Sequence, residues 1–104
     1  MEEAEPLFRQ GIEIGKATIG EGHPDYAKHL NNLAMLYEDM GRFDAAKPLY
    51  DQAVKINLAA LGAEHPQSKR HAYNYADLLL KHFPDDPALQ ELQGTFGPDV
   101  GKRS

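Results

Sequence analysis

The chain has 104 residues, enough for one small domain or part of a larger protein, and its 41% hydrophobic and 26% charged residues are typical of a folded domain. It contains no cysteine, which excludes disulfides, cysteine nucleophiles and cysteine-ligated zinc. Its formal net charge of −5 argues against binding to nucleic acid, which requires a basic surface. No apolar run approaches the ~18 residues of a membrane span, so we expect no membrane partner and a cytoplasmic location.

The sequence aligns with itself, without a gap, at an offset of 42 residues. Identical residues in the two copies include Ala4 and Ala46, Pro6 and Pro48, Leu7 and Leu49, Gly20 and Gly62, His23 and His65, Pro24 and Pro66, His29 and His71, Asn32 and Asn74, and Ala34 and Ala76. An ungapped match of this density indicates a repeat protein.

The first unit is incomplete. At the same offset, residues 1–4 align with residues 43–46, which lie at the start of the second helix of the following unit. Residues 1–22 are therefore expected to form half a repeat, a single helix that carries Leu7 and Phe8. Because a repeat buries its apolar face only against its neighbours, three alternatives follow: one flank of this helix lies open, a second copy covers it, or the chain is excised from a longer array.

The second unit, residues 23–64, is expected to be a full repeat of two helices. In its first half, apolar and small residues recur every three or four positions, which predicts a helix with one buried face. Pro24 suits the first turn of that helix, and Gly41 can end it in the left-handed conformation. A second helix is expected from Asp44 until Gly62 stops it.

The third unit, residues 65–93, is degenerate. Pro66 again opens a helix, with alanine, tyrosine and leucine at the buried spacing. Asp86 can cap, and Pro87 can open, a short second helix that ends near residue 93. The glycines and the proline that follow interrupt regular structure, so we expect residues 94–104 to form a flexible tail.

The order of small and large core residues resembles that of the tetratricopeptide repeat. The positions that carry the resemblance are Leu30, Leu33, Ala34, Tyr37, Ala46, Tyr50 and Ala53. The 42-residue unit is longer than the ~34 residues of the ordinary repeat and, with the phrases Gly22-His23-Pro24-Asp25, Leu30-Asn31-Asn32-Leu33-Ala34 and Ala46-Lys47-Pro48-Leu49-Tyr50, resembles the kinesin light chain class. The resemblance implies an all-α fold, an α-solenoid of antiparallel helix hairpins with about two repeats and incomplete ends.

In similar proteins the first helices of successive units line a concave surface that holds peptides, so the resemblance implies a protein–protein interaction module. The residues at the corresponding positions here are Lys28, Asn31, Asn32, Met35, Arg70, Tyr73 and Asn74. Asparagine side chains can pair both the N–H and the C=O groups of an extended peptide, and Lys28 and Arg70 can hold an acidic group. The alternative is that these residues form an ordinary solvated helix face.

Catalysis and metal binding are not expected. His23 and His29 are six residues apart, as are His65 and His71, whereas a helical zinc pair has i, i+4 spacing. We expect His23 and His65 instead to pack or hydrogen-bond at the bend before each proline.

No nucleophile motif supports an enzyme, so we expect no enzyme, no cofactor and no metal. The alternative to peptide binding is self-association, in which residues 1–22 join a second copy to give a homo-oligomer. A third alternative is that the array regulates an enzyme domain elsewhere in a longer chain.

Overall fold

The computed structural model describes residues 22–101, so nearly all of the half repeat expected at residues 1–22 lies outside the described part. Within residues 22–101 the chain forms four helices and no strand, which confirms the expected all-α fold. The helices are α2 (Pro24–Asp39), α3 (Phe43–Ala60), α4 (Pro66–His82) and α5 (Pro87–Phe96).

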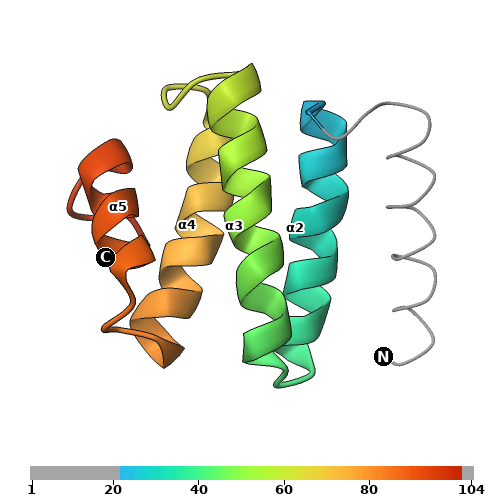
Figure 1. Cartoon of the computed structure of the whole chain (residues 1–104), viewed down its shortest axis with the longest axis vertical. Helices are drawn as coiled ribbons and strands as arrows, with labels where there is room; N and C mark the ends of the chain where they lie inside the picture. Colours follow the sequence, from blue (N-terminus) through green and yellow to red (C-terminus); the bar gives the residue numbers. More distant parts are fainter. Residues whose placement is uncertain (1–21, 102–104) are drawn as a thin grey trace.

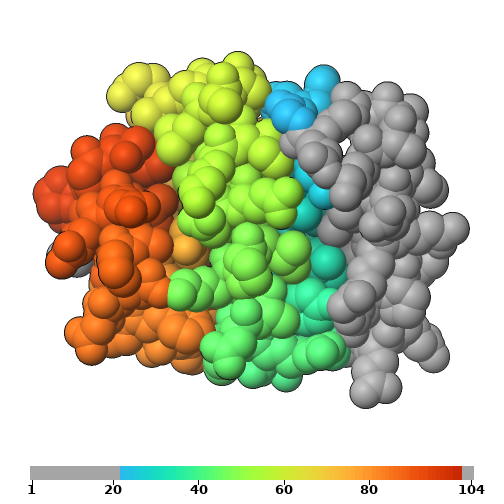
Figure 2. Space-filling model, viewed as in Figure 1, coloured from blue at the N-terminus to red at the C-terminus, as the bar shows by residue number. Residues whose placement is uncertain are grey.

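Successive helices run antiparallel and are joined by short turns, so they lie in chain order across the molecule (Figure 1). In the view of Figure 2 the surface of α3 occupies the middle of the molecule, with α5 on one side and α2 on the other. The helix α3 packs extensively on both α2 and α4, whereas the shorter α5 packs on α4. The array of helix hairpins expected from the repeat is therefore present.

A histidine caps the first helix of each described repeat. His23 Nδ1 accepts the backbone N–H of Asp25, and His65 Nδ1 accepts that of Gln67, each at 3.1 Å. The backbone of each histidine is extended, and a proline follows it in the first helical turn. The missing N–H of proline costs no hydrogen bond at that position. This confirms the prediction that these two histidines hydrogen-bond at the bend before the proline.

Glycines mark the ends of α2 and α3, as the sequence predicts. Gly41 has a φ of 77° and Gly62 a φ of 86°, in the left-handed region that other residues rarely adopt. The observed helices end within about two residues of the predicted positions, because these start and stop signals are local.

The core is built from fully buried alanines interleaved with large side chains. Alanines with no exposed surface let neighbouring helices approach closely, and they are Ala27, Ala34, Ala46, Ala53, Ala72 and Ala76. The rings of Tyr50 and Tyr75 stack with their centroids 6.3 Å apart and fill the space between α3 and α4. Leu49 and Ile56, also on α3, are only half-buried and pack against this core.

The C-terminal end differs from the sequence prediction. The helix α5 continues through Gly94 to Phe96, whereas the sequence predicts an end near residue 93. Phe96 is partly buried against the core, and this contact outweighs the modest helix penalty of one glycine.

Val100 is only 1% exposed, so the described residues after α5 pack on the molecule, contrary to the expected flexible tail. The division into units at residues 1–22, 23–64, 65–93 and 94–104 otherwise stays a prediction.

Candidate functional site

A groove of about 390 Å³ lies between α2 and α4, the first helices of the two described repeats. Six of the seven residues predicted to contact a peptide line it, together with Gln67 and His71. The six are Lys28, Asn31, Asn32, Met35, Arg70 and Asn74. The helical periodicity of the two copies places these side chains on facing surfaces, since each helix buries its opposite face against α3.

Tyr73 is the exception among the predicted site residues. Its side chain is 42% exposed, but it does not line the groove. It follows His71 and Ala72, which are both buried, and points in a different direction from Asn74 around α4. Its participation in binding stays a prediction.

Two of the asparagines bond to each other across the groove. Asn74 donates from Nδ2 to Oδ1 of Asn31 at 3.3 Å, and Asn31 donates to the sulfur of Met35 at 3.5 Å. Asn31 is almost fully buried, so its side chain is not available to contact a ligand directly. Its hydrogen bond instead holds Asn74 in place. The side chain of Asn32, by contrast, is exposed and has no hydrogen-bond partner among residues 22–101.

The basic side chains of Lys28 and Arg70 lie at one end of the groove. Lys28 lies 3.7 Å from the carboxylate of Asp25, one turn earlier on α2, where both groups are exposed and the pair is weak. Arg70 occupies the equivalent position on α4 and forms no ion pair with any described residue. Met35 adds an apolar surface that is 45% exposed. The groove therefore offers amide groups, an apolar patch and a planar cation.

Sequence reasoning missed a row of hydrogen bonds beside these residues, which is part-buried at Gln67 and buried between Asn57 and His71. Gln67 donates from Nε2 to the backbone oxygen of Pro24 at 3.1 Å and to Oδ1 of Asn57 at 3.0 Å. Nδ2 of Asn57 lies 2.6 Å from Nδ1 of His71. We call this row of four residues, Pro24, Gln67, Asn57 and His71, the amide relay. It joins α2, α3 and α4 and so fixes the spacing of the two helices that form the groove.

The histidine of the relay is held neutral. Burial, followed by the positive charges of Arg70 and Lys28, lowers the pKa of His71 to about 4. Its side chain is 4% exposed, yet the ring contributes to the groove surface. At neutral pH, His71 therefore contributes one N–H donor and one acceptor nitrogen.

In the sequence, the two amide side chains of the relay are marked only as differences between the copies of the repeat. At the 42-residue offset Asn57 corresponds to Gly15, and Gln67 corresponds to Asp25. The relay amides are thus positions where the two copies differ, although His71 corresponds to another histidine, His29. Such differences mark features that one repeat has and the other lacks, but they do not say which side chains meet.

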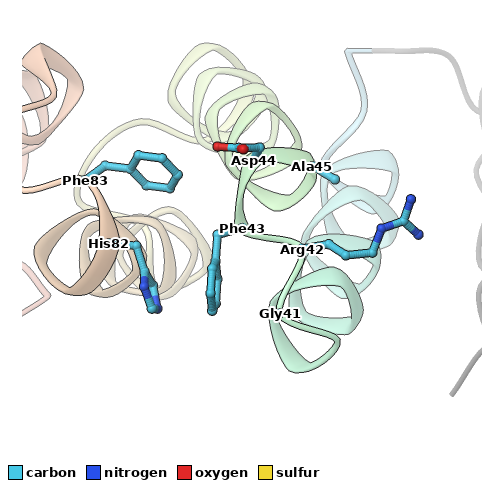
Figure 3. A pocket seen from close by; sticks show the side chains of 7 residues that line it. All are labelled: Gly41, Arg42, Phe43, Asp44, Ala45, His82 and Phe83. Carbon is cyan, nitrogen blue, oxygen red and sulfur yellow. The ribbon is translucent and has the colours of Figure 1, made fainter.

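A second hollow lies where the turn between α2 and α3 meets the end of α4 (Figure 3). The ring of Phe43 stacks on that of His82 with centroids 3.6 Å apart, and Arg42 points away from this pair toward α2. Arg42 lies over the ring of Tyr37 at 4.9 Å. These contacts join neighbouring turns of the array, so we assign this hollow a structural role.

A smaller apolar cleft of about 100 Å³ lies between α3 and α5. Val54, Leu58 and Leu92 line it, and the ion pair between Lys55 and Asp51, at 2.8 Å, lies on its rim. It has no row of amide groups comparable to the groove between α2 and α4.

A family model for the tetratricopeptide repeat matches residues 1–59 and again residues 27–93, which together cover most of the chain. The chain is a tetratricopeptide repeat protein. The two matches overlap over residues 27–59, as expected when a repeat model fits a repetitive sequence more than once. The family is one of protein–protein interaction modules.

The fold agrees with this assignment. The crystal structure of BtubC (BKLC) from P. vanneervenii superimposes on this tetratricopeptide protein with a TM-score of 0.76 at 20% sequence identity. The match covers 91% of this chain and 37% of BtubC, so the chain spans a little over a third of that protein's length. The prediction of a tetratricopeptide repeat fold is confirmed. A comparison with curated protein sequences finds no significant match.

The described helices contain neither a metal-binding cluster nor a membrane span. Among residues 22–101, no three His, Asp or Glu side chains gather where they could hold a metal ion. None of the helices in this part of the tetratricopeptide protein is both long and apolar enough to cross a membrane.

Proposed function

We propose that the groove between α2 and α4 binds an extended peptide segment of a partner protein. The observation that carries this proposal is that six residues from two successive repeats, chosen from their sequence positions, line one groove. Such convergence is what a binding surface made of repeated helices requires, whereas solvated residues at unrelated positions would not share a concave site.

Each residue in the groove has a distinct part in this proposal. Asn32 and Asn74 pair with backbone amides, and Asn31 keeps Asn74 in its orientation through their 3.3 Å bond. Met35 contacts an apolar side chain of the peptide. Arg70, with its planar guanidinium free of ion pairs to described residues, holds an acidic group of the peptide by two parallel hydrogen bonds, and Lys28 supports it.

The affinity of this groove alone is expected to be modest. Two facing helices desolvate few side chains, so most of the interaction free energy is offset by the cost of ordering the peptide. We expect dissociation constants in the micromolar range, and tighter binding where further repeats extend the groove. A scaffold role, with action in the cytoplasm, is part of this proposal.

The test begins with selection of peptides from a phage-displayed library on the whole chain. A selected peptide is then measured by calorimetry against wild type, Arg70→Ala and Asn32→Ala. Loss of a charged hydrogen bond at Arg70 is expected to weaken binding ~10-fold, and loss of the amide at Asn32 ~5-fold. Lys69→Ala is the matched control, since Lys69 neighbours Arg70 on α4 but does not line the groove.

Equal binding by wild type, Arg70→Ala and Asn32→Ala would contradict the groove proposal. The alternative of self-association through the half repeat falls on residues 1–22, almost entirely outside the described part, and stays a prediction. Light scattering over a dilution series tests it: a dimer that persists at low concentration supports self-association, and a monomer contradicts it.

A further inference from the structure

The amide relay determines which ring nitrogen of His71 carries the proton. The backbone oxygen of Pro24 can only accept a hydrogen bond. The Gln67 group that lies 3.1 Å from it must therefore be the NH₂ end of the amide. The same NH₂ group contacts Asn57 at 3.0 Å, so the Asn57 atom that faces it must be the oxygen.

The orientation of Asn57 then determines the state of His71. With its oxygen turned to Gln67, Asn57 presents its NH₂ to Nδ1 of His71, 2.6 Å away. A donor facing Nδ1 requires this nitrogen to be the acceptor, so a neutral His71 carries its proton on Nε2. One backbone carbonyl on α2 thus sets the tautomer of a histidine on α4 through two side-chain amides, of which Asn57 is fully buried.

The remaining nitrogen of His71 is available at the groove. Nε2 has no hydrogen-bond partner among residues 22–101, and within that range Ser68 Oγ is the only side-chain polar atom that is both sealed from solvent and unpartnered. Nε2 therefore keeps contact with solvent. Since the ring lines the groove and Nδ1 turns inward to Asn57, the N–H of Nε2 is directed toward the groove.

An acceptor lies one helical turn further along α4. Asn74 uses its Nδ2 to donate to Asn31, which leaves its Oδ1 without a partner among the described residues. Residues three positions apart on a helix are neighbours on one face. His71 and Asn74 therefore present a donor and an acceptor side by side, both oriented by buried amides behind them.

From this arrangement we infer that His71 and Asn74 form a two-point site for a C=O group and an N–H group that a peptide ligand presents on the same side. Nε2–H of His71 donates to the C=O, and Oδ1 of Asn74 accepts the N–H. A residue in an extended backbone offers such a pair, and so does a side-chain carboxamide. The inference rests on the proposed function, because it assigns a polar contact within the same groove, and it adds His71 as a binding residue with Asn57 and Gln67 as its positioning residues.

The first test needs no ligand. Long-range ¹H–¹⁵N correlation spectra of the whole chain report which nitrogen of His71 bears the proton, and we expect Nε2 throughout the neutral range. Gln67→Glu should reverse the relay: a carboxylate accepts from Asn57, which then turns its oxygen toward Nδ1 of His71 and draws a proton there. Gln52→Glu on the exposed side of α3 introduces the same charge away from the relay and should leave the tautomer unchanged. An Nδ1–H tautomer in the wild type would overturn the inference.

The second test measures binding of the phage-selected peptide. His71→Phe keeps an aromatic ring but removes the N–H, and we expect binding ~5-fold weaker, with recovery in His71→Gln, which restores a donor. His29→Phe, at the equivalent position of the preceding repeat, is the matched control. If both His71 variants fail to fold, binding is measured on Gln67→Glu instead. This substitution should move the proton of His71 to Nδ1 and thereby weaken binding of the peptide.

The chemistry of the amide is tested in the peptide. Replacing one backbone amide at a time by an ester removes its N–H, and we expect one ester to weaken binding in wild type but not in Asn74→Leu. A second outcome is that every ester is tolerated, while substitution of an Asn or Gln in the peptide weakens binding in wild type but not in Asn74→Leu. The C=O and N–H groups then come from a side chain, which also supports the inference. If neither change depends on Asn74, the two-point site is wrong.

The results separate the two proposals. A peptide that is sensitive to Arg70→Ala but binds His71→Phe and Gln67→Glu as tightly as wild type overturns only the present inference. A peptide insensitive to Arg70→Ala, Asn32→Ala and His71→Phe alike overturns the proposed function and this inference with it.

Discussion

At the scale of single residues, His71 couples the groove to pH. Burial, followed by the charges of Arg70 and Lys28, lowers its pKa to about 4 in the folded protein, whereas an exposed histidine titrates near 6.5. Above pH 7 the folded and unfolded chains both hold a neutral histidine. As the pH falls from about 6.5 to about 4, the unfolded chain binds a proton that the folded chain does not, so stability decreases over this window.

We therefore predict that the free energy of unfolding falls by about 2 kcal/mol between pH 6.5 and pH 4 because of His71, after allowance for solvent screening at the groove. Urea titrations at several pH values measure it. His71→Phe, which cannot titrate, should show a shallower decrease over the same interval. Parallel pH profiles for the two proteins would contradict the assignment.

Two glycines near the C-terminus should respond in opposite directions to the same substitution. A Cβ at Gly101 would lie 2.6 Å from the Cβ of Ala76, and its φ of 79° is unfavourable for alanine, so Gly101→Ala should destabilise the protein by about 1–2 kcal/mol. Gly94 lies within α5 with no atom within 4 Å of an added Cβ, so Gly94→Ala should stabilise it by about 0.5 kcal/mol.

Thermal unfolding of both variants measures this pair, with Gly94→Ala as the control for the loss of glycine flexibility. Equal shifts in the two melting temperatures would mean that the packing of residues 97–101 on α4 contributes nothing to stability.

At the scale of elements, helix starts and stops are predictable from sequence because their causes lie within a few residues. His23 and His65 cap, Gly41 stops, and Asp86 caps α5 by accepting the backbone N–H of Ala88 at 2.9 Å. The end of α5 was not predictable in this way. It depends on contacts of Phe96 with the core, which arise only after α3 and α4 have come together.

The attachment of α5 depends on one carboxylate. Asp86 caps the helix and forms an ion pair with Lys47 of α3, and hydrogen bonding to Lys47 and to the backbone of Ala88 holds its pKa below the usual range. Asp86→Ala should therefore destabilise the protein by about 1–2 kcal/mol. Hydrogen exchange should show the loss of protection concentrated in α5.

Asp85→Ala is the matched control for this experiment. Asp85 is the exposed neighbour of Asp86 and forms no ion pair with described residues, so its removal should leave the exchange of α5 unchanged. If both variants exchange alike, the cap and ion pair of Asp86 do not anchor α5.

At the scale of the whole molecule, the groove was largely predictable and the relay beneath it was not. The 42-residue offset and the helical period suffice to place Lys28, Asn32, Arg70 and Asn74 on facing helices. The relay depends on the contact of Gln67 with Pro24, which lies 43 residues earlier, and on the crossing of three helices. No local pattern encodes such a meeting, so it became visible only in three dimensions.

We propose that the surface between α2 and α4, and not the cleft between α3 and α5, binds the peptide. The most direct measurement is a titration of the ¹⁵N-labelled chain with the phage-selected peptide, followed by backbone and side-chain amide shifts. We predict that the largest chemical-shift changes are those of Asn32, Arg70 and Asn74 and of the amide groups next to them. Changes concentrated instead at Val54, Leu58 and Leu92 would contradict the account.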